Sequence, residues 1–387
     1  MNPVEIKKDI YWVGGIDWDL RNFHGYSTER GSTYNAYLIV DDHITLVDTV
    51  KHYLFDEMLE RICKVIDPAK IKYIISNHVE MDHSGSIPFL LERCPGATVI
   101  TSPNGEKGLK MHYGPNMPLK VVNNGDELKI GKRSLKFVLM PMVHWPDSMA
   151  TYIPEEKILL PNDAFGQHIA SSERFDDEFP WEILKHEAAK YYANIVLPYG
   201  RQVNKALEAV KAIPVDIIGP SHGLILRSKI SDMIKLYGDW ANNVTARKAI
   251  VVYDTMWNST KKIALAIHEA FLDSGINARL LNLETNHISD IMTEMLYAEY
   301  IAVGSPTLNN GLLPAVSAFL TYMKGLAPKN RKALAFGSYG WGGQSVDEID
   351  KVLNDCGFQM LDKIKLQYVP LEGVLNDMKN KLKEVLK

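Results

Sequence analysis

The chain has 387 residues, which is long for one compact core and suits two domains of about 100–200 residues each. Hydrophobic residues make up 46% and charged residues 23%, a balance that excludes a disordered or fibrous protein. The formal net charge is -4, and no segment gathers excess lysine and arginine, so nucleic acid is not expected as a partner. The expected partners are small molecules or other proteins.

The three cysteines, Cys63, Cys94 and Cys356, lie far apart and form no CxxC pair. This pattern predicts neither a disulfide framework nor a sulfur-ligated cluster, and it favours a reducing, cytoplasmic location. The N-terminal segment MNPVEIKKDIYW lacks the apolar core of a signal peptide, and no apolar run approaches the ~20 residues that cross a bilayer. We expect neither export nor a membrane span.

Residues 1–245 form the first predicted domain, which is rich in short strands with covering helices. A hairpin is expected from YNAYLIV and HITLVDT, a helix from FDEMLERICKVI, and a buried strand from IKYIIS. Further strands are expected in ELKIGKRSLKFVLMP, MATYIP and KILLPNDA. Several of these strands end close to a histidine or an aspartate, where functional sites tend to gather.

The pattern changes after Trp240 and the polar stretch 242–245, so we place the second domain at residues 246–387. The strands AIVVYDT, ARLLNLE, YIAVGSPT and ALAFGSYG alternate there with helices predicted at 260–274, up to Ala298 and after Pro314. Apolar strands separated by helices predict a doubly wound parallel sheet covered on both faces. A ligand is expected at the carboxyl ends of these strands.

The strongest chemical signal is the segment HVEMDH at residues 78–83, which crowds four potential metal ligands after a buried strand. Alternate residues of an extended segment project to one side, so His78, Glu80 and Asp82 are expected to converge, with His83 turned toward a second centre. A solvated polar loop is the alternative. The spacing favours a metal site.

Three more candidate ligands follow predicted strands: His144 after FVLMPMV, Asp163 after KILLPN, and His222 after VDIIGPS. Any one of them alone would more often be an ordinary surface or core residue. Their shared position at strand ends favours a common site.

This arrangement resembles the metallo-β-lactamase superfamily, whose His-x-His-x-Asp-His loop is followed by distant His, Asp and His ligands. The chain departs from that pattern at Glu80, where the zinc hydrolases carry a second histidine. A carboxylate in place of an imidazole makes the site harder and more anionic, which favours two irons over zinc. Hydrolysis by zinc is therefore less expected.

The His-x-Glu-x-Asp-His loop, together with HWPDS at 144–148 and NDAFGQH at 162–168, resembles the flavodiiron family, also called A-type flavoproteins. The resemblance implies an N-terminal metallo-β-lactamase-like αββα sandwich and a C-terminal flavodoxin-like domain. By the family's pattern, one iron is bound by His78, Glu80 and His144, the other by Asp82, His83 and His222, and Asp163 bridges them. In the family the histidine corresponding to His83 is found both on and off the metal.

Two further residues are assigned roles beside the irons. His168 is similar in position to a family residue of the substrate pocket, where a proton donor would assist O–O cleavage, and a purely structural histidine is equally open. Asp48, which closes the strand HITLVD, is expected to support the ligands without binding metal.

The second domain carries three segments that resemble the flavin loops of flavodoxins. Hydroxyl and backbone N–H groups of the first, at a helix N-terminus, would cradle an FMN phosphate, although helix capping alone would also explain its residue types. The other two segments follow the third and fourth strands and would enclose the flavin ring, with aromatic faces for stacking. The expected FMN contacts are Thr255, Met256, Trp257, Asn258, Ser259 and Thr260; Ser305, Pro306, Thr307 and Asn309; and Ser338, Tyr339, Gly340, Trp341 and Gly343.

The resemblance implies an oxidoreductase in which FMN and two irons hold the four electrons that take dioxygen to two waters. Two electrons suffice to join two NO molecules into nitrous oxide, so NO is the alternative substrate. In the family the FMN and irons of one subunit lie too far apart for fast transfer. A head-to-tail homodimer, or a higher oligomer, is therefore expected.

An external donor is expected, because no strand is followed by the GxGxxG of a nicotinamide site and no rubredoxin-like CxxC pair is present. The chain resembles the minimal, two-domain form of the family found in strict anaerobes, both acetogens and methanogens, where the role would be oxygen detoxification. Rubredoxin or a reduced 5-deazaflavin coenzyme are the two expected donors. The rival functions are a zinc hydrolase with a fused flavodoxin and an electron carrier without enzymatic activity.

Overall fold

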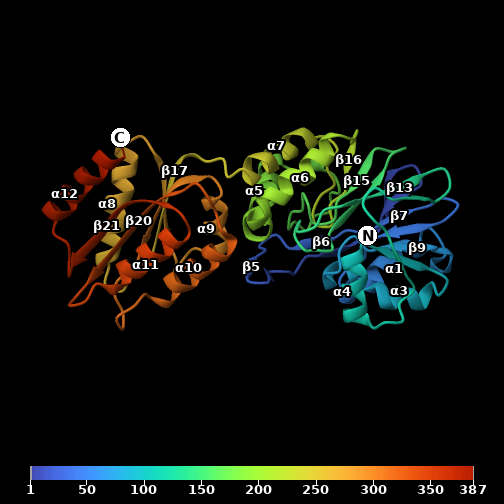
Figure 1. The fold of residues 1–387 in the computed structure, drawn as a ribbon, viewed down its shortest axis with the longest axis horizontal. Helices are drawn as coiled ribbons and strands as arrows, with labels where there is room; N and C mark the ends of the chain where they lie inside the picture. Colours follow the sequence, from blue (N-terminus) through green and yellow to red (C-terminus); the bar gives the residue numbers. More distant parts are fainter. Residues whose placement is uncertain (1, 387) are drawn as a thin grey trace. The chain divides into compact units, whose positions relative to one another are not determined.

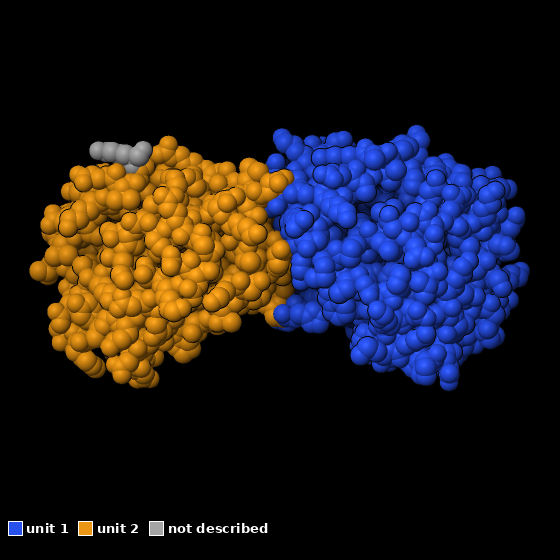
Figure 2. Space-filling view, in the orientation of Figure 1, with its two compact units in different colours: residues 1–24, 28–192, 199–241 blue, residues 25–27, 193–198, 242–387 orange. Residues whose placement is uncertain are grey.

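The computed structural model describes residues 2–386, which divide into two compact units (Figure 2). Unit 1 comprises the chain up to His24, Thr28–Tyr192 and Tyr199–Ala241, and unit 2 comprises Gly25–Ser27, Ala193–Pro198 and the chain from Asn242 onward. The junction between Ala241 and Asn242 falls a few residues before the domain boundary predicted at residue 245. The limits of two independently folding domains stay a prediction.

Unit 1 contains two sheets, with seven and five strands. The first has the order β1 (Val4–Lys7), β2 (Ile10–Trp12), β7 (Tyr37–Ile39), β8 (Thr45–Val47), β9 (Tyr73–Ile75), β10 (Thr98–Thr101) and β11 (Leu119–Val121). The second has the order β12 (Glu127–Lys129), β13 (Ser134–Leu139), β14 (Met149–Ile153), β15 (Ile158–Leu160) and β16 (Ile217–Ile218). A two-stranded sheet of β3 (Gly15–Asp17) and β6 (Ser32–Tyr34) completes unit 1. The short strand β4 (Asn22–Phe23) is paired with β5 (Tyr26–Ser27), whose residues are assigned to unit 2.

The two sheets face each other across one hydrophobic core. Ile75 and Ile100 of the first sheet pack in the same cluster as Phe137 and Met149 of the second, and all four are fully buried. Burying each such side chain contributes about 1.5–3 kcal/mol. This common core fixes the two sheets as the inner layers of a sandwich.

Helices form the outer layers of unit 1. The other face of the seven-stranded sheet packs against Met58 of α1 (Phe55–Cys63), Leu90 of α3 (Ile87–Arg93) and Leu109 of α4 (Pro103–Tyr113). On the opposite side, α5 (Trp181–Tyr191), α6 (Gly200–Lys211) and α7 (Ile230–Ala241) lie beside β15 and β16 (Figure 1). Unit 1 is thus an αββα sandwich.

The strand directions gather the candidate ligands. β8 runs parallel to β9, so their carboxyl ends, which lead to Asp48 and His78, meet at one edge of the first sheet. β15 runs parallel to β16, so Asp163 and His222 likewise follow neighbouring strand ends in the second sheet. Because the sheets are stacked, the two edges bring these segments together.

Unit 2 has one fully parallel sheet with the order β18 (Asn277–Asn282), β17 (Ala246–Tyr253), β19 (Ala298–Gly304), β20 (Lys332–Tyr339) and β21 (Gln359–Gln367). The helices α8 (Ser259–Asp273) and α12 (Glu372–Val385) lie on one face, and α9 (Ile288–Met295), α10 (Pro314–Leu326) and α11 (Gln344–Asp355) lie on the other (Figure 1). This is the doubly wound order 2-1-3-4-5 of flavodoxin-like folds.

The expected elements of unit 2 are present with small shifts in their ends. The helix predicted at 260–274 spans Ser259–Asp273, while the helix predicted to reach Ala298 ends at Met295, because Ala298 is the first residue of β19. Among residues 2–386, no helix has both the length and the apolar character needed to cross a membrane.

A buried carboxylate in α5 makes the stability of the protein depend on pH. Glu187 is 4% exposed and accepts a hydrogen bond from Arg30 Nε at 3.2 Å. Burial raises its pKa to about 7, although Lys190 and Arg30 partly oppose the shift. The folded chain therefore holds the proton of the Glu187 carboxyl more tightly than the unfolded chain does. The stability gained from this difference is present below pH 4.5 and is lost as the pH rises through about 7.

The free energy of unfolding of Glu187→Gln, relative to wild type, should therefore be about 2–3 kcal/mol more favourable to the variant at pH 8 than at pH 5. Chemical denaturation at both pH values measures the effect. Glu182→Gln, on the exposed side of the same helix, is the control and should show no such growth. A stability difference for Glu187→Gln that does not change with pH would show that the carboxyl is ionised throughout.

Candidate functional site

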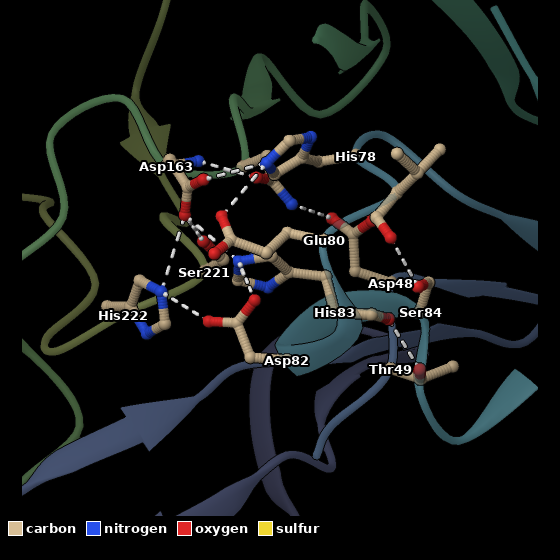
Figure 3. Close-up of polar contacts among 12 residues, drawn as sticks. Asp48, Thr49, His78, Glu80, Asp82, His83, Ser84, Asp163, Ser221 and His222 are labelled. Carbon is tan, nitrogen blue, oxygen red and sulfur yellow. Dashed lines mark hydrogen bonds and ion pairs between the residues drawn. The ribbon is translucent and has the colours of Figure 1, made fainter. Parts of the chain in front are cut away.

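Seven histidine, aspartate and glutamate side chains of unit 1 converge in two groups. Figure 3 labels all of them except His144. Within each group the potential ligand atoms lie within 4.8 Å of one another. Glu80 and His144 are partly exposed and the other five are buried. The first group is His78, Glu80, His144 and Asp163, and the second is Asp82, His83 and His222.

The two oxygens of Asp163 face different groups. Oδ2 lies 3.1 Å from His144 Nε2 and 3.6 Å from His78 Nε2. Oδ1 lies 3.1 Å from His83 Nε2 and 3.3 Å from His222 Nε2. A single carboxylate is therefore shared by both groups, which is the arrangement that the family pattern predicts for a bridging ligand.

One prediction from spacing was wrong. Asp82 was expected to converge with His78 and Glu80 as part of an extended segment, but the helix α2 (Met81–Ser84) begins at the intervening residue. The helical turn places Asp82 beside His83, with 3.3 Å between Asp82 Oδ1 and His83 Nε2. Asp82 therefore belongs to the second group, as the family pattern predicts.

The atoms of these groups fit metal ions. Among the described residues, His78 Nε2, both carboxylate oxygens of Asp82 and both ring nitrogens of His83 are buried without a hydrogen-bond partner. Such atoms are costly to bury unless a ligand satisfies them. Donor atoms at about 2.0–2.2 Å from one ion lie roughly 3.0–3.4 Å apart, close to the separations of 3.1–3.6 Å across Asp163.

Metal ions must compete with protons for the ligands of this cluster. Burial alone would raise the pKa of Asp163, but the surrounding histidines, beginning with His83, hold it well below its usual range. Burial alone would lower the pKa of His222, but Asp163 and Asp82 raise it to about 10. The metal-free cluster thus holds protons that a metal must displace, so metal affinity falls as the pH falls.

Asp147, which the sequence analysis did not single out, orients a candidate ligand. Its Oδ2 lies 2.9 Å from His78 Nδ1 and accepts a hydrogen bond from Val79 N at 2.8 Å. His222 is oriented similarly, with Nδ1 2.8 Å from the Thr33 carbonyl oxygen. The aspartate of the HWPDS motif was the available signal, since metal-bound histidines commonly donate their second N–H to a carboxylate.

Replacing Asp147 with alanine should weaken metal binding about 10–100-fold, because His78 loses its orienting acceptor. Competition with a chelator, followed by metal analysis, measures the affinity. Asp126→Ala is the control, because Asp126 caps a turn through Asn123 N at the start of β12 and contacts no candidate ligand. An Asp147→Ala chain that holds metal as tightly as wild type would mean that the backbone alone positions His78.

Asp48 supports the site without lying in either group. Its carboxylate accepts hydrogen bonds from Asn77 N and Nδ2 at 2.8 and 2.9 Å and from Asn162 Nδ2 at 3.2 Å. Asn77 and Asn162 precede His78 and Asp163 directly in the chain. Asp48 therefore ties together the two strand ends that carry these ligands.

His168 lies behind the second group and is not part of it. Its Nδ1 is 2.8 Å from Ser32 Oγ, and its ring packs against His222 with 4.9 Å between centroids. Burial, and secondly His222, lower its pKa well below the usual value, so the ring is neutral. A neutral imidazole at this position is compatible with either role considered above.

Unit 2 contains a cavity of about 660 Å³ at the carboxyl ends of β17, β19, β20 and β21. This volume lies within the ~300–1,000 Å³ typical of small-molecule sites. None of its lining residues is charged. Ten of the expected FMN contacts line it: Met256, Trp257, Ser259, Pro306, Thr307, Asn309, Ser338, Tyr339, Gly340 and Trp341.

The other five expected contacts lie outside the lining. Thr260 Oγ1 lies 2.8 Å from Ser338 Oγ, and this contact joins the first flavin loop to the third. Ser305 Oγ accepts a hydrogen bond from Leu313 N. Asn258 and Gly343 precede α8 and α11. The Thr255 hydroxyl is buried without a hydrogen-bond partner among the described residues, as a phosphate-binding group would be.

Four lining residues are not among the predicted FMN contacts: Asn310, Gly342, Tyr368 and Val369. Tyr368 and Val369 follow β21, and the rule that ligands bind at strand carboxyl ends could have found them. Trp257 and Trp341 are 87% and 92% exposed, which is unusual for tryptophan unless a ligand or partner covers it.

Comparisons with known proteins agree with both sites. The protein-family model described as ODP family beta lactamase matches residues 33–223, and the protein-family model for flavodoxin matches residues 251–384. The rubredoxin-oxygen oxidoreductase of Megalodesulfovibrio gigas is 41% identical, covering 98% of this chain and 96% of that protein. A crystal structure of the flavodiiron protein from Giardia intestinalis superimposes with a TM-score of 0.97 at 35% identity, covering 100% of this chain and 96% of the other.

The chain belongs to the flavodiiron protein family. The predicted fold, a metallo-β-lactamase-like αββα sandwich followed by a flavodoxin-like sheet, is confirmed. Another relative in this family is the nitric oxide reductase of Moorella thermoacetica, which is 44% identical and covers 95% of this chain and 94% of that protein.

Proposed function

We propose that this chain reduces dioxygen to water, with electrons passing from an external donor through FMN to a diiron site. The observation that carries the proposal is the Asp163 carboxylate, whose two oxygens face two separate groups of ligands. Membership in the flavodiiron family and the uncharged cavity in the flavodoxin-like unit support the same reading.

Different sets of residues would bind the two irons and the FMN. One iron would be held by His78, Glu80 and His144, the other by Asp82, His83 and His222, with Asp163 shared between them. Hydroxyl and backbone groups at the start of α8 would hold the FMN phosphate, and the loops after β19 and β20 would enclose the flavin ring. When bound, two irons and FMN supply the four electrons that dioxygen needs.

The protein's own groups prepare the metal site for this chemistry. Asp147 and the Thr33 carbonyl oxygen fix the rings of His78 and His222, so that each presents Nε2 to the shared space. Ser221 Oγ donates a hydrogen bond to Asp163 Oδ1 at 2.9 Å and steadies the shared carboxylate. Burial of five of the seven ligands limits the entry of water.

A mixed imidazole and carboxylate set argues against the zinc hydrolase alternative. Three carboxylates, Glu80, Asp82 and Asp163, accompany the four histidines, and such a set suits iron. A flavin cavity would also have no use in a hydrolase. Metal analysis of the protein as purified should find about two irons and little zinc per chain.

We extend the proposal to the electron donor, the oligomeric state and the cellular location. Rubredoxin is the first donor to test, because a relative is named rubredoxin-oxygen oxidoreductase, and a reduced deazaflavin coenzyme is the second. We also propose a head-to-tail homodimer and a cytoplasmic location. Sedimentation of the FMN- and iron-loaded protein at twice the chain mass would support the dimer.

Nitric oxide is the second candidate substrate, because a relative at 44% identity is named nitric oxide reductase. Steady-state turnover with reduced rubredoxin should give a kcat/KM for dioxygen at least about tenfold above that for NO. Zinc-substituted protein serves as the control and should consume neither gas. A higher kcat/KM for NO, with nitrous oxide as the product, would replace the oxygen assignment.

A further inference from the structure

Lys51 is a partly exposed lysine whose charge is unpaired and lies close to the second group of metal ligands. Its ammonium lies 4.8 Å from the centroid of the Phe23 ring, 5.0 Å from that of Tyr34 and 6.0 Å from that of Tyr53. Among the residues that the structure describes, none forms an ion pair or a hydrogen bond with this ammonium. A charge that is partly withdrawn from water usually has a partner, so the unpaired state of Lys51 calls for a reason.

Hydrogen bonds tie the segment that carries Lys51 to the segment that carries the second group. The backbone N–H of Thr49 donates to the His83 carbonyl oxygen at 3.0 Å. The Ser86 hydroxyl donates to the Val50 carbonyl oxygen at 2.7 Å. Lys51 follows Val50 directly in the chain, so these contacts fix the starting point of its side chain beside the second group.

Two buried aromatic rings contact both the Lys51 ammonium and a ligand of the second group. The centroids of Phe23 and Tyr34 lie 6.2 and 5.4 Å from that of the His222 imidazole. Phe23 is 8% exposed and Tyr34 is fully buried. This side of the ammonium therefore faces protein and not bulk water, and a charge acts over a longer range through protein than through water.

A fixed positive charge at this place distinguishes between the species that can occupy the site. Dioxygen, NO and water are uncharged, whereas superoxide, which forms when dioxygen takes up a single electron, is an anion at neutral pH. The ammonium therefore attracts superoxide without attracting the substrate or the final product. At separations of roughly 10 Å and an effective dielectric constant of about 20, a unit charge changes the affinity for a monovalent anion about tenfold.

We propose that Lys51 retains small monovalent anions, and superoxide above all, beside the second group of metal ligands. The inference rests on the proposed function, in which one dioxygen takes up four electrons and four protons to give two waters. Retention by Lys51 forms and breaks no covalent bond. It keeps the one-electron product within reach of the remaining three electrons, so that reduction proceeds to water and superoxide does not escape.

A binding measurement tests the effect of this charge without turnover. The probe is azide, a stable monovalent anion, titrated calorimetrically into zinc-loaded, full-length protein at ~0.01 M ionic strength, where the Debye length is about 30 Å. Lys51→Met should weaken azide binding about tenfold at unchanged zinc content, and Lys51→Arg, which keeps the charge, should bind azide like wild type. Lys120→Met is the matched control, because it removes the same charge from an exposed position in the edge strand β11 and should leave azide binding unchanged.

A second measurement tests retention itself in the FMN- and iron-loaded protein. The superoxide released per dioxygen consumed is measured by electron paramagnetic resonance with a spin trap. This ratio should rise about tenfold in Lys51→Met at unchanged iron and FMN content, and it should stay at the wild-type value in Lys51→Arg and Lys120→Met.

Equal azide affinities in Lys51→Met and Lys120→Met, or equal superoxide release by these two variants, would overturn the proposal. Lys51→Arg that behaves like Lys51→Met would also overturn it, because packing and not charge would then be responsible. A wild-type protein that does not reduce dioxygen would instead refute the proposed function, and the azide affinities would still show whether Lys51 attracts anions to this site.

Discussion

Asp163→Asn should leave the protein with one iron or fewer per chain and lower dioxygen reduction by more than ~10²-fold. The substitution removes the negative charge that lies between four histidine Nε2 atoms at 3.1–3.6 Å, and an amide cannot offer an anionic oxygen to both groups. The loss should exceed the 10–100-fold that follows removal of an outer partner of a ligand. Iron analysis and oxygen-electrode assays measure the two effects.

Asp216→Asn is the matched control for this substitution. Asp216 lies at the start of β16 in the same unit, and its only described ion pair is an exposed contact with Lys157. The control should keep wild-type iron and activity. Two irons and more than half of the activity in Asp163→Asn would show that the carboxylate does not bridge.

Gly337→Ala should weaken FMN binding by about 10²-fold or more, in line with the ~2–3 kcal/mol expected when a new atom strains a packed site. A Cβ at Gly337 would lie 2.1 Å from the Ser305 carbonyl oxygen and 2.9 Å from Val346 Cγ2. The backbone between Ser305 and Pro306 must therefore move, and Pro306 lines the cavity. Fluorescence titration of the flavin-free chain with FMN measures the affinity.

Gly373→Ala provides the comparison, because a Cβ at this position in α12 would meet nothing within 4 Å. Its FMN affinity should equal that of wild type, and both variants should keep their iron. If Gly337→Ala binds FMN as tightly as Gly373→Ala, the flavin lies outside this cavity.

Much of the metal site was predictable because ligands follow strand ends. His78, Asp163 and His222 each follow a short buried strand, and parallel neighbours β8 and β9, or β15 and β16, carry such ends to one edge. Sequence spacing could not show which strand ends of the two stacked sheets lie together. It therefore identified the candidate ligands one by one, and only the family resemblance predicted how they divide into two groups.

The errors arose where local geometry departs from a regular element. α2 spans only four residues, too few for a periodic signal, yet it moves Asp82 from one group to the other. Asp147 acts through His78, and a single aspartate in a loop carries no spacing signal. Tyr368 was missed because it lines the cavity from beyond the last strand, far along the chain from the other flavin loops.

Mössbauer spectroscopy of the oxidised, ⁵⁷Fe-loaded protein tests whether two irons share the Asp163 carboxylate. We expect two high-spin ferric ions per chain, coupled antiferromagnetically into a diamagnetic ground state, and loss of that coupling in Asp163→Asn. Uncoupled ferric ions in the wild-type protein, or a site that retains zinc and excludes iron, would show that Asp163 does not bridge a pair of irons.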